Sequence, residues 1–186
     1  MDNIYIERVL SGDSHAFVYF VKTYKDMAFS IALSILKKEH LAEEAVQDVY
    51  VQSYLSLSSF KKQSKFSTWF YRIVVHCSYK LMQKKAIKTV EFELMQHDVL
   101  VDESGLSRLL EAEKKQLVNE ALLQIPANES LALRLFYLEE LSIREICDIT
   151  GWTTANTKVI LHRGRNNMYN KMNLLLKEPH YGIERR

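Results

Sequence analysis

The sequence predicts an all-α protein made of two small helical domains joined by an acidic linker. Glycine and proline are scarce, at 5 and 2 of 186 residues, which disfavours a β protein with many turns. Apolar residues recur at spacings of three and four over long stretches, which is the period of amphipathic helices. That period lapses once, where the chain becomes acidic. We therefore expect a first domain over residues 1–88, a linker over 89–107, a second domain over 108–177 and a tail over 178–186.

Four helices are expected in the first domain, and their patterns cover residues 4–10, 16–36, 41–57 and 68–85. A polar loop over residues 58–67 precedes the last of them and carries three lysines. This last helix begins with consecutive aromatic residues and ends in lysines. Large rings at a helix start usually pack in a core, so we expect at least one of Trp69 and Phe70 to be buried.

Four further helices are expected in the second domain, over residues 109–123, 130–138, 142–150 and 154–176. Pro126 separates the first two because proline interrupts a helix. Ser142 is a typical N-cap for the third helix. Gly151 ends that helix, since glycine readily adopts the positive φ that a tight helix end requires.

Charge is distributed unevenly along the chain, although the formal net charge is only +2. The net charge is +5 over residues 1–88, −5 over 89–107, −2 over 108–140 and +4 over 141–186. Two basic ends therefore flank an acidic middle.

Several classes of protein are disfavoured by what the sequence lacks. Cys77 and Cys147 stand far apart without a CxxC motif, so we interpret them as small buried thiols in a reducing cytosol. No signal peptide and no long apolar run is present. No paired carboxylates, metal-ligand cluster, nucleophile elbow or phosphate-binding loop occurs. We expect a soluble cytoplasmic protein that is not an enzyme, needs no cofactor or metal, and does not insert into a membrane.

The last two expected helices form a helix-turn-helix pattern, in which two helices cross steeply over a short turn containing glycine. The inner face of the second helix would carry Leu161, Gly164 and Met168, and Cys147 would be the small residue at the crossing. The outer face is basic, as entry into the major groove requires. Taken alone, these charges could equally be solvated groups on a surface helix.

The stretch LEELSIREICDITGWTTANTKVILHRGRNNM resembles region 4 of bacterial sigma factors of the extracytoplasmic-function (ECF) group. The first domain resembles region 2 of the same family in three motifs in the expected order, GDSHAF (12–17), AEEAVQDVY (42–50) and FSTWFYRI (66–73). Together the matches cover nearly the whole chain. The departures are His76, Lys80 and Gln83 in the helix that follows the third motif, and Cys147, Asn156, Val159 and Ile160 in the helix-turn-helix.

This resemblance implies a transcription initiation subunit that joins core RNA polymerase through its β′ and β subunits, binds promoter DNA and helps to open the duplex. The residues expected at the minus-35 element are Thr154, Asn156, Thr157, Lys158, His162, Arg163 and Arg165. Those expected at the opened minus-10 element, where unstacked bases need pockets and phosphates need cations, are Lys61, Lys62, Lys65, His76, Tyr79, Lys80, Gln83 and Lys84. Those expected to bind the β′ subunit are Glu44, Gln47, Asp48, Val51 and Gln52.

Three further expectations follow. The family is often controlled by an anti-sigma factor, which the resemblance implies as a partner here. The acidic linker, with Asp98, Asp102 and Glu103, either occupies the basic nucleic-acid channel of the polymerase or is an ordinary spacer. The alternative function is a helix-turn-helix transcriptional regulator whose N-terminal domain senses a signal or dimerises.

Overall fold

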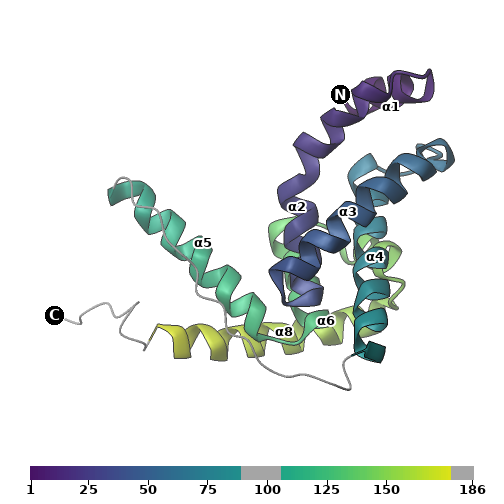
Figure 1. The fold of residues 1–186 in the computed structure, drawn as a ribbon. Coiled ribbons are helices and arrows are strands. Elements are labelled where there is room, and N and C mark those ends of the chain that lie inside the picture. Colours follow the sequence, from purple (N-terminus) through teal and green to yellow (C-terminus); the bar gives the residue numbers. More distant parts are fainter. Residues whose placement is uncertain (89–105, 177–186) are drawn as a thin grey trace.

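The computed structural model describes residues 1–88 and 106–176, and within these ranges it contains helices and no strand (Figure 1). The all-α prediction is therefore confirmed. The expected acidic linker, apart from its last two residues, and all of the expected tail lie outside the described residues. The elements are α1 (Asp2–Leu10), η1 (Ser14–Phe17), α2 (Val18–Leu36), α3 (Glu39–Ser56), η2 (Leu57–Ser59), α4 (Phe66–Lys88), α5 (Leu106–Gln124), α6 (Ala127–Leu133), η3 (Arg134–Leu138), α7 (Ile143–Thr150) and α8 (Thr154–Leu175).

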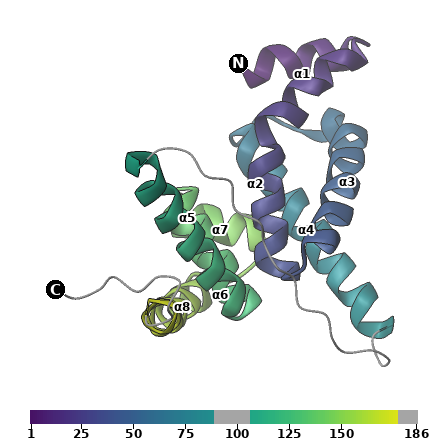
Figure 2. The same cartoon turned by 60° about the vertical axis from the view of Figure 1, so that its left-hand side comes forward.

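Helices α2, α3 and α4 form a bundle in the N-terminal half (Figure 2). Small residues let the helices approach, since Ala28, Ala42 and Ala45 are fully buried. An aromatic cluster fills the other end of the bundle, where the ring of Phe70 lies 5.4 Å from Tyr24 and 5.7 Å from Tyr50. Phe70 is completely buried, which confirms the expected packing role at the start of α4.

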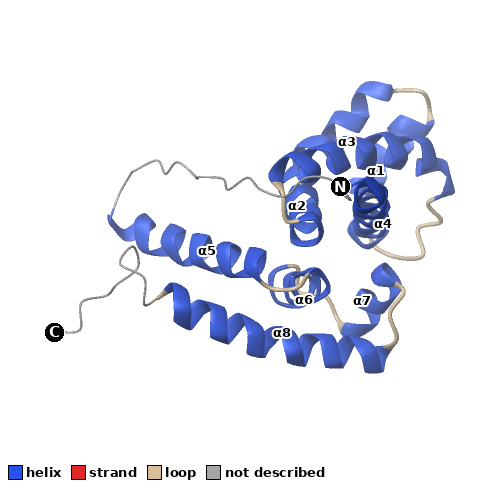
Figure 3. Cartoon of the chain, turned by 60° about the horizontal axis from the view of Figure 1, so that its bottom comes forward, coloured by secondary structure: helices blue, strands red, loops and turns tan. Residues whose placement is uncertain are grey.

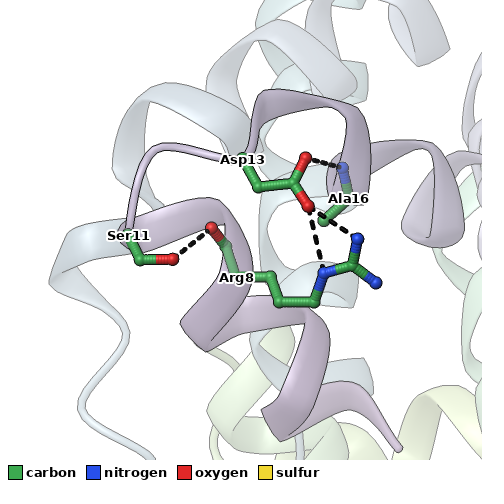
Figure 4. A network of polar contacts seen from close by, with 4 residues as sticks. All are labelled: Arg8, Ser11, Asp13 and Ala16. Carbon is green, nitrogen blue, oxygen red and sulfur yellow. Dashed lines mark hydrogen bonds and ion pairs between the residues drawn. The ribbon is translucent and has the colours of Figure 1, made fainter.

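Helix α1 is joined to α2 by a tight turn that is held by polar contacts (Figure 4). Arg8 donates two hydrogen bonds to one carboxylate oxygen of Asp13, at 3.0 and 2.6 Å, and the other oxygen accepts from the backbone N–H of Ala16 at 3.3 Å. Gly12 occupies the turn with φ of 105°. Asp2 then anchors the start of α1 to α2, because it accepts hydrogen bonds from two tyrosine hydroxyls at 2.8 Å.

The C-terminal half packs around α6, which contacts α8, while the second half of α8 lies along α5 (Figure 3). Helix α6 begins directly after Pro126, three residues before the expected start at Ser130. It continues into the π-helical turn η3, where the backbone hydrogen bond from Glu139 N–H reaches the carbonyl of Arg134. Proline at a helix N-terminus needs no N–H partner, so it starts α6 as well as ending the preceding helix.

The two halves share one hydrophobic core. Leu131, Leu135, Ile146 and Ile149 from the C-terminal half join the core of the α2–α4 bundle, and α7 packs on α4. Side-chain hydrogen bonds between described residues also join the two halves. They run from Lys37 Nζ to the Leu122 carbonyl (2.7 Å), from Arg134 Nε to Ser34 Oγ (2.8 Å), from the Tyr71 hydroxyl to Glu139 (2.8 Å) and from the Tyr79 hydroxyl to Asn128 (2.6 Å).

Two of these donors are charged groups removed from water. Burial, together with the positive charge of Arg134, lowers the pKa of Lys37 to about 8. Burial also lowers the pKa of Arg134, whose Nη2 donates to Asn119 Oδ1 at 2.8 Å. Neutral oxygens are the partners in these hydrogen bonds, and the nearby carboxylate of Glu139 partly opposes the lowering of the Arg134 pKa. In the described part of the chain, no helix has the length and apolar character needed to cross a membrane.

Candidate nucleic-acid interface

Both helices of the helix-turn-helix have well-defined starts. Ser142 Oγ accepts from the backbone N–H of Glu145 at 3.3 Å, and the Glu145 carboxylate accepts from the backbone N–H of Ser142 at 2.9 Å. These hydrogen bonds hold the pKa of Glu145 below its usual value. The capping box confirms the predicted N-cap. Helix α7 ends at Gly151, with φ of 76°, and Thr153 caps α8 by accepting from the N–H of Asn156.

Thr157 lies inside the crossing of α7 and α8 rather than on the DNA side. It is 0% exposed, its hydroxyl donates to the Thr153 carbonyl at 3.0 Å, and the Sγ of Cys147 lies 3.3 Å away. The expectation that Thr157 contacts DNA is therefore wrong. Cys147 is confirmed as a small residue at the crossing. Ile160 is also buried, at 8% exposed, so its departure from the family pattern changes the core and not the DNA face.

The inner face of α8 is confirmed. Leu161 and Gly164 are buried, and Met168 is half-buried against two hydrophobic clusters. The remaining residues expected at the minus-35 element are all exposed on α8, namely Thr154, Asn156, Lys158, His162, Arg163 and Arg165. Of these, Arg165 donates a hydrogen bond to the hydroxyl of Tyr137 at 3.3 Å.

A second basic face lies on α4. His76, Lys80, Gln83 and Lys84 are exposed and fall on one side of the helix, because they are three or four residues apart. Tyr79 does not share this face. It is half-buried, its hydroxyl donates to Asn128 of α6, and burial raises its pKa to about 12. In this arrangement of the two halves Tyr79 faces α6, so its contact with minus-10 DNA stays a prediction that requires the two halves to separate.

The loop between η2 and α4 brings its lysines to the start of that basic helix. Lys61, Lys62 and Lys65 are all exposed. Lys62 adopts a positive φ of 56° and its ammonium forms an ion pair with Glu7 of α1 at 2.8 Å, which lowers the pKa of Glu7. The contact ties α1 to this loop, a link that nothing in the spacing of the sequence could have revealed.

The expected polymerase-binding stripe is exposed on α3 over Gln47, Asp48, Val51 and Gln52. Glu44 is half-buried and pairs with Lys85 of α4 at 3.0 Å, so its charge is partly neutralised within the bundle. Next to the stripe, Leu55 is 69% exposed and Val51 is 61% exposed. Sequence reasoning missed Leu55, although its position four residues after Val51 places both on one side of the helix. No group of three or more metal-ligating side chains occurs within residues 1–88 and 106–176.

Comparison with protein families accounts for this combination of faces. The model of sigma-70 region 2 matches residues 20–86, and that of sigma-70 region 4 matches residues 115–168. The chain belongs to the sigma-70 family of sigma factors. The two matches comprise α2–α4 on one side and most of α5–α8 on the other, so the basic faces of α4 and α8 fall in different regions.

Curated relatives place this sigma factor in the ECF group, which confirms the resemblance seen in the sequence. It is 28% identical over 173 residues to the ECF RNA polymerase sigma factor SigW of Bacillus subtilis, with 86% of this chain and 90% of the relative covered. It is 25% identical over 185 residues to the ECF RNA polymerase sigma-E factor of Escherichia coli K12, with 95% and 96% covered.

Two solved structures share the fold of this sigma factor. One is the sigma factor RpoE in complex with the anti-sigma factor NepR from Bartonella quintana, with a TM-score of 0.69, 20% identity, and coverage of 85% of this chain and 97% of that chain. The other is CnrH in complex with the cytosolic domain of CnrY, with a TM-score of 0.61, 17% identity, and coverage of 93% and 97%.

Proposed function

We propose that this sigma factor joins core RNA polymerase, directs it to promoters with distinct minus-35 and minus-10 elements, and assists strand opening. The observation that carries the proposal is the pair of family matches in the order region 2 then region 4, each containing an exposed basic helix face. The chain would contribute binding and positioning, with catalysis left to the polymerase. It would act where the polymerase acts, in the cytoplasm.

The minus-35 element is assigned to α8. A helix that enters the major groove needs cations at its edges for phosphates and polar side chains for base edges. Exposed residues of both kinds lie on α8, with Lys158, Arg163 and Arg165 as the cations. The capped N-terminus of α8 adds backbone N–H groups that favour a phosphate.

The minus-10 element is assigned to α4 and the loop before it. Single-stranded DNA requires a cationic track for its phosphates and platforms for its unstacked bases. Lys80 and Lys84 with the loop lysines supply the cations, while Trp69 and Phe60, whose rings lie 5.3 Å apart, are the half-buried aromatic groups nearest that loop. Phe70 is excluded from such contacts because it is completely buried.

Polymerase binding is assigned to α3. Asp48 supplies charge to orient the chain on a basic surface of the β′ subunit, and the exposed Val51 and Leu55 supply apolar area. The β subunit is the expected contact of the second half. A charge reversal, Asp48→Lys, should weaken binding to purified core enzyme at least tenfold while leaving the helical content unchanged.

Run-off transcription with purified core polymerase tests the proposed function. The chain should initiate at specific promoters only when core enzyme is present, and should bind duplex promoter DNA weakly by itself. A transcriptional regulator, which is the alternative function, would instead bind duplex DNA tightly without core enzyme. Tight unaided binding together with no promoter-dependent initiation would exclude the sigma-factor function.

An anti-sigma factor is proposed as a further partner. The support is the family and a solved structure of the same fold, which holds the sigma factor RpoE with the anti-sigma factor NepR. An anti-sigma factor of this chain should compete with core polymerase for it in a binding assay. A partner that binds the chain and core enzyme together would not be an anti-sigma factor.

A further inference from the structure

The exposed face of α8 carries an apolar residue close to its centre. Each residue of an α-helix is turned by about 100° from the one before. The buried residues Thr157, Ile160, Leu161 and Gly164 lie on one side of α8. The opposite side carries Ala155, Val159 and Asn166, and both Ala155 and Asn166 lie within about 40° of Val159. Val159 is 46% exposed.

Two cations of α8 lie toward one edge of this face. Lys158 and Arg165 are turned about 100° and 120° from Val159 toward one edge. Asn156 and Arg163 are turned about 60° and 40° toward the other. In a recognition helix, the centre of the exposed face meets the base edges on the floor of the groove, and the edges meet the two phosphate backbones. Lys158 and Arg165 are therefore placed for phosphates rather than for bases.

The central position restricts what Val159 can recognise. Its side chain cannot form a hydrogen bond, and the one apolar group that a base pair presents in the major groove is the C5-methyl of thymine. An apolar protein surface is a poor partner, because covering Val159 would also desolvate the exposed Lys158, His162 and Arg163. DNA instead supplies phosphates for these cations and a methyl group for Val159.

We propose that Val159 contacts the C5-methyl group of a thymine in the minus-35 element and thereby helps to determine which promoters are chosen. The small side chain of Ala155, one turn earlier on the same line, allows α8 to approach the groove floor closely. Asn156 beside them can bond the N6 and N7 atoms of an adenine in the same or a neighbouring pair. The inference rests on the proposed function and specifies a base that α8 prefers in the minus-35 element.

The test replaces single thymines by deoxyuridine, which differs only in carrying hydrogen in place of the C5-methyl group. Holoenzyme made from core polymerase and this chain is assayed for open-complex formation on a promoter that it transcribes. Each thymine of the minus-35 element, on either strand, is replaced in turn. At one position the replacement should reduce open-complex formation by the wild-type holoenzyme about fourfold, because one methyl group is no longer buried against the protein. Val159→Ala should respond equally to thymine and deoxyuridine at that position.

Lys158→Gln is the matched control. It removes a phosphate contact, so activity should fall on every template while the ratio between thymine and deoxyuridine stays as in the wild type. Because Val159 is exposed, circular dichroism should show unchanged folding of Val159→Ala. The proposal is overturned if no thymine is sensitive in the wild type, or if Val159→Ala keeps the wild-type ratio. Failure of the proposed function would give a different result, because the holoenzyme would then transcribe no promoter at all.

Discussion

At the scale of single residues, the helix-turn-helix depends on the cap of α7. The first backbone N–H groups of a helix have no partner within the helix. Ser142 and Glu145 satisfy each other's backbone N–H groups, and the Ser142 hydroxyl also donates to the Glu145 carboxylate at 2.7 Å. Because α7 has only eight residues, a frayed first turn would remove a large part of it. The cap therefore helps to set the platform on which α8 rests.

Replacement of Ser142 by alanine should destabilise the protein by about 1 kcal/mol, the typical cost of losing an N-cap. Urea unfolding monitored by circular dichroism measures the loss. Ser58→Ala is the matched control, because Ser58 is exposed and lies outside this cap. Equal stability of Ser142→Ala and the wild type would show that α7 does not depend on the cap.

The same cap predicts that the stability of the protein changes with pH in the acid range. Hydrogen bonds from Ser142 hold the pKa of Glu145 below 4.5, its ordinary value. A carboxylate whose pKa is lowered by folding contributes stability that is present above the unfolded pKa and is lost as the pH falls through the folded value. The difference in unfolding free energy between the wild type and Ser142→Ala should therefore narrow below about pH 4.5. A difference that stays constant down to pH 3 would contradict the charge-assisted cap.

At the scale of elements, α8 lies close to α6 at Gly164. A Cβ atom at this position would lie 3.2 Å from Cγ of Leu133 and 3.4 Å from both the Cβ and the backbone oxygen of Glu129. Leu133 is buried, so it has little space in which to move. The close contact of these two helices holds the recognition helix on the rest of the C-terminal half.

A larger side chain at this contact should separate the helices. Gly164→Val is expected to destabilise the protein by about 1–3 kcal/mol, as overpacking of a core does. Gly164→Ala is the control, because the small clash of one methyl group is offset by a gain in helix propensity of about 1 kcal/mol. Thermal and urea unfolding measure both variants. An equal loss of stability in the two variants would show that the size of the side chain at this helix contact does not determine the stability.

How far the elements could be predicted depends on the range of the interaction involved. The period of apolar residues predicted a helix over 154–176, close to the observed Thr154–Leu175, and local cap chemistry predicted Ser142 and Gly151. Thr157 could not be assigned in this way. Its polar side chain is typical of a DNA contact, and only the crossing angle of α7 over α8 places it against Cys147.

Contacts between distant elements account for the other departures. Nothing in the period of α4 distinguishes Tyr79 from the residues of its basic face, because its partner Asn128 lies 49 residues away. The expectation of two domains joined by a linker likewise gave no reason to place Ile146 and Ile149 in the core of the first half. Such pairings depend on the packing of whole helices, which local sequence patterns do not encode.

At the scale of the whole molecule, the arrangement of the two halves bears on promoter binding. The minus-35 and minus-10 elements are about 25 base pairs apart, or about 85 Å along B-DNA. A compact chain of this length has a radius of gyration of only about 16 Å. We therefore expect the halves to separate when both elements are bound, which exposes Lys37 and Arg134 to water. Hydration of these two cations offsets part of the free energy lost with the shared apolar contacts.

Lys37 makes the packed state sensitive to pH. Its pKa is about 8 when its ammonium is buried beside Arg134 and donates to the Leu122 carbonyl, against an ordinary value of 10.5. Between these values the unfolded chain binds more protons than the folded chain, so stability rises as the pH rises from about 8 toward 10. Since Lys37 is still partly exposed, solvent screening limits the gain to about 1 kcal/mol. From about pH 9 upward this gain is opposed, because Tyr71 and Tyr79 have raised pKa values in the packed state and their unfolded forms then begin to lose protons.

Substitution of Lys37 by methionine should abolish this rise. Unfolding free energies measured in urea at half-unit steps from pH 7 to 9 should rise for the wild type relative to Lys37→Met, which lacks the titrating ammonium group. Lys38→Met is the matched control, because the neighbouring lysine is exposed and should keep the wild-type slope. The slope of the unfolding free energy against pH is the deciding quantity. Lys37 has a positive φ of 60°, so a substitution there can shift the stability by the same amount at every pH. A wild-type slope in Lys37→Met would mean that another group titrates between the halves, and the role given to the buried lysine would be wrong.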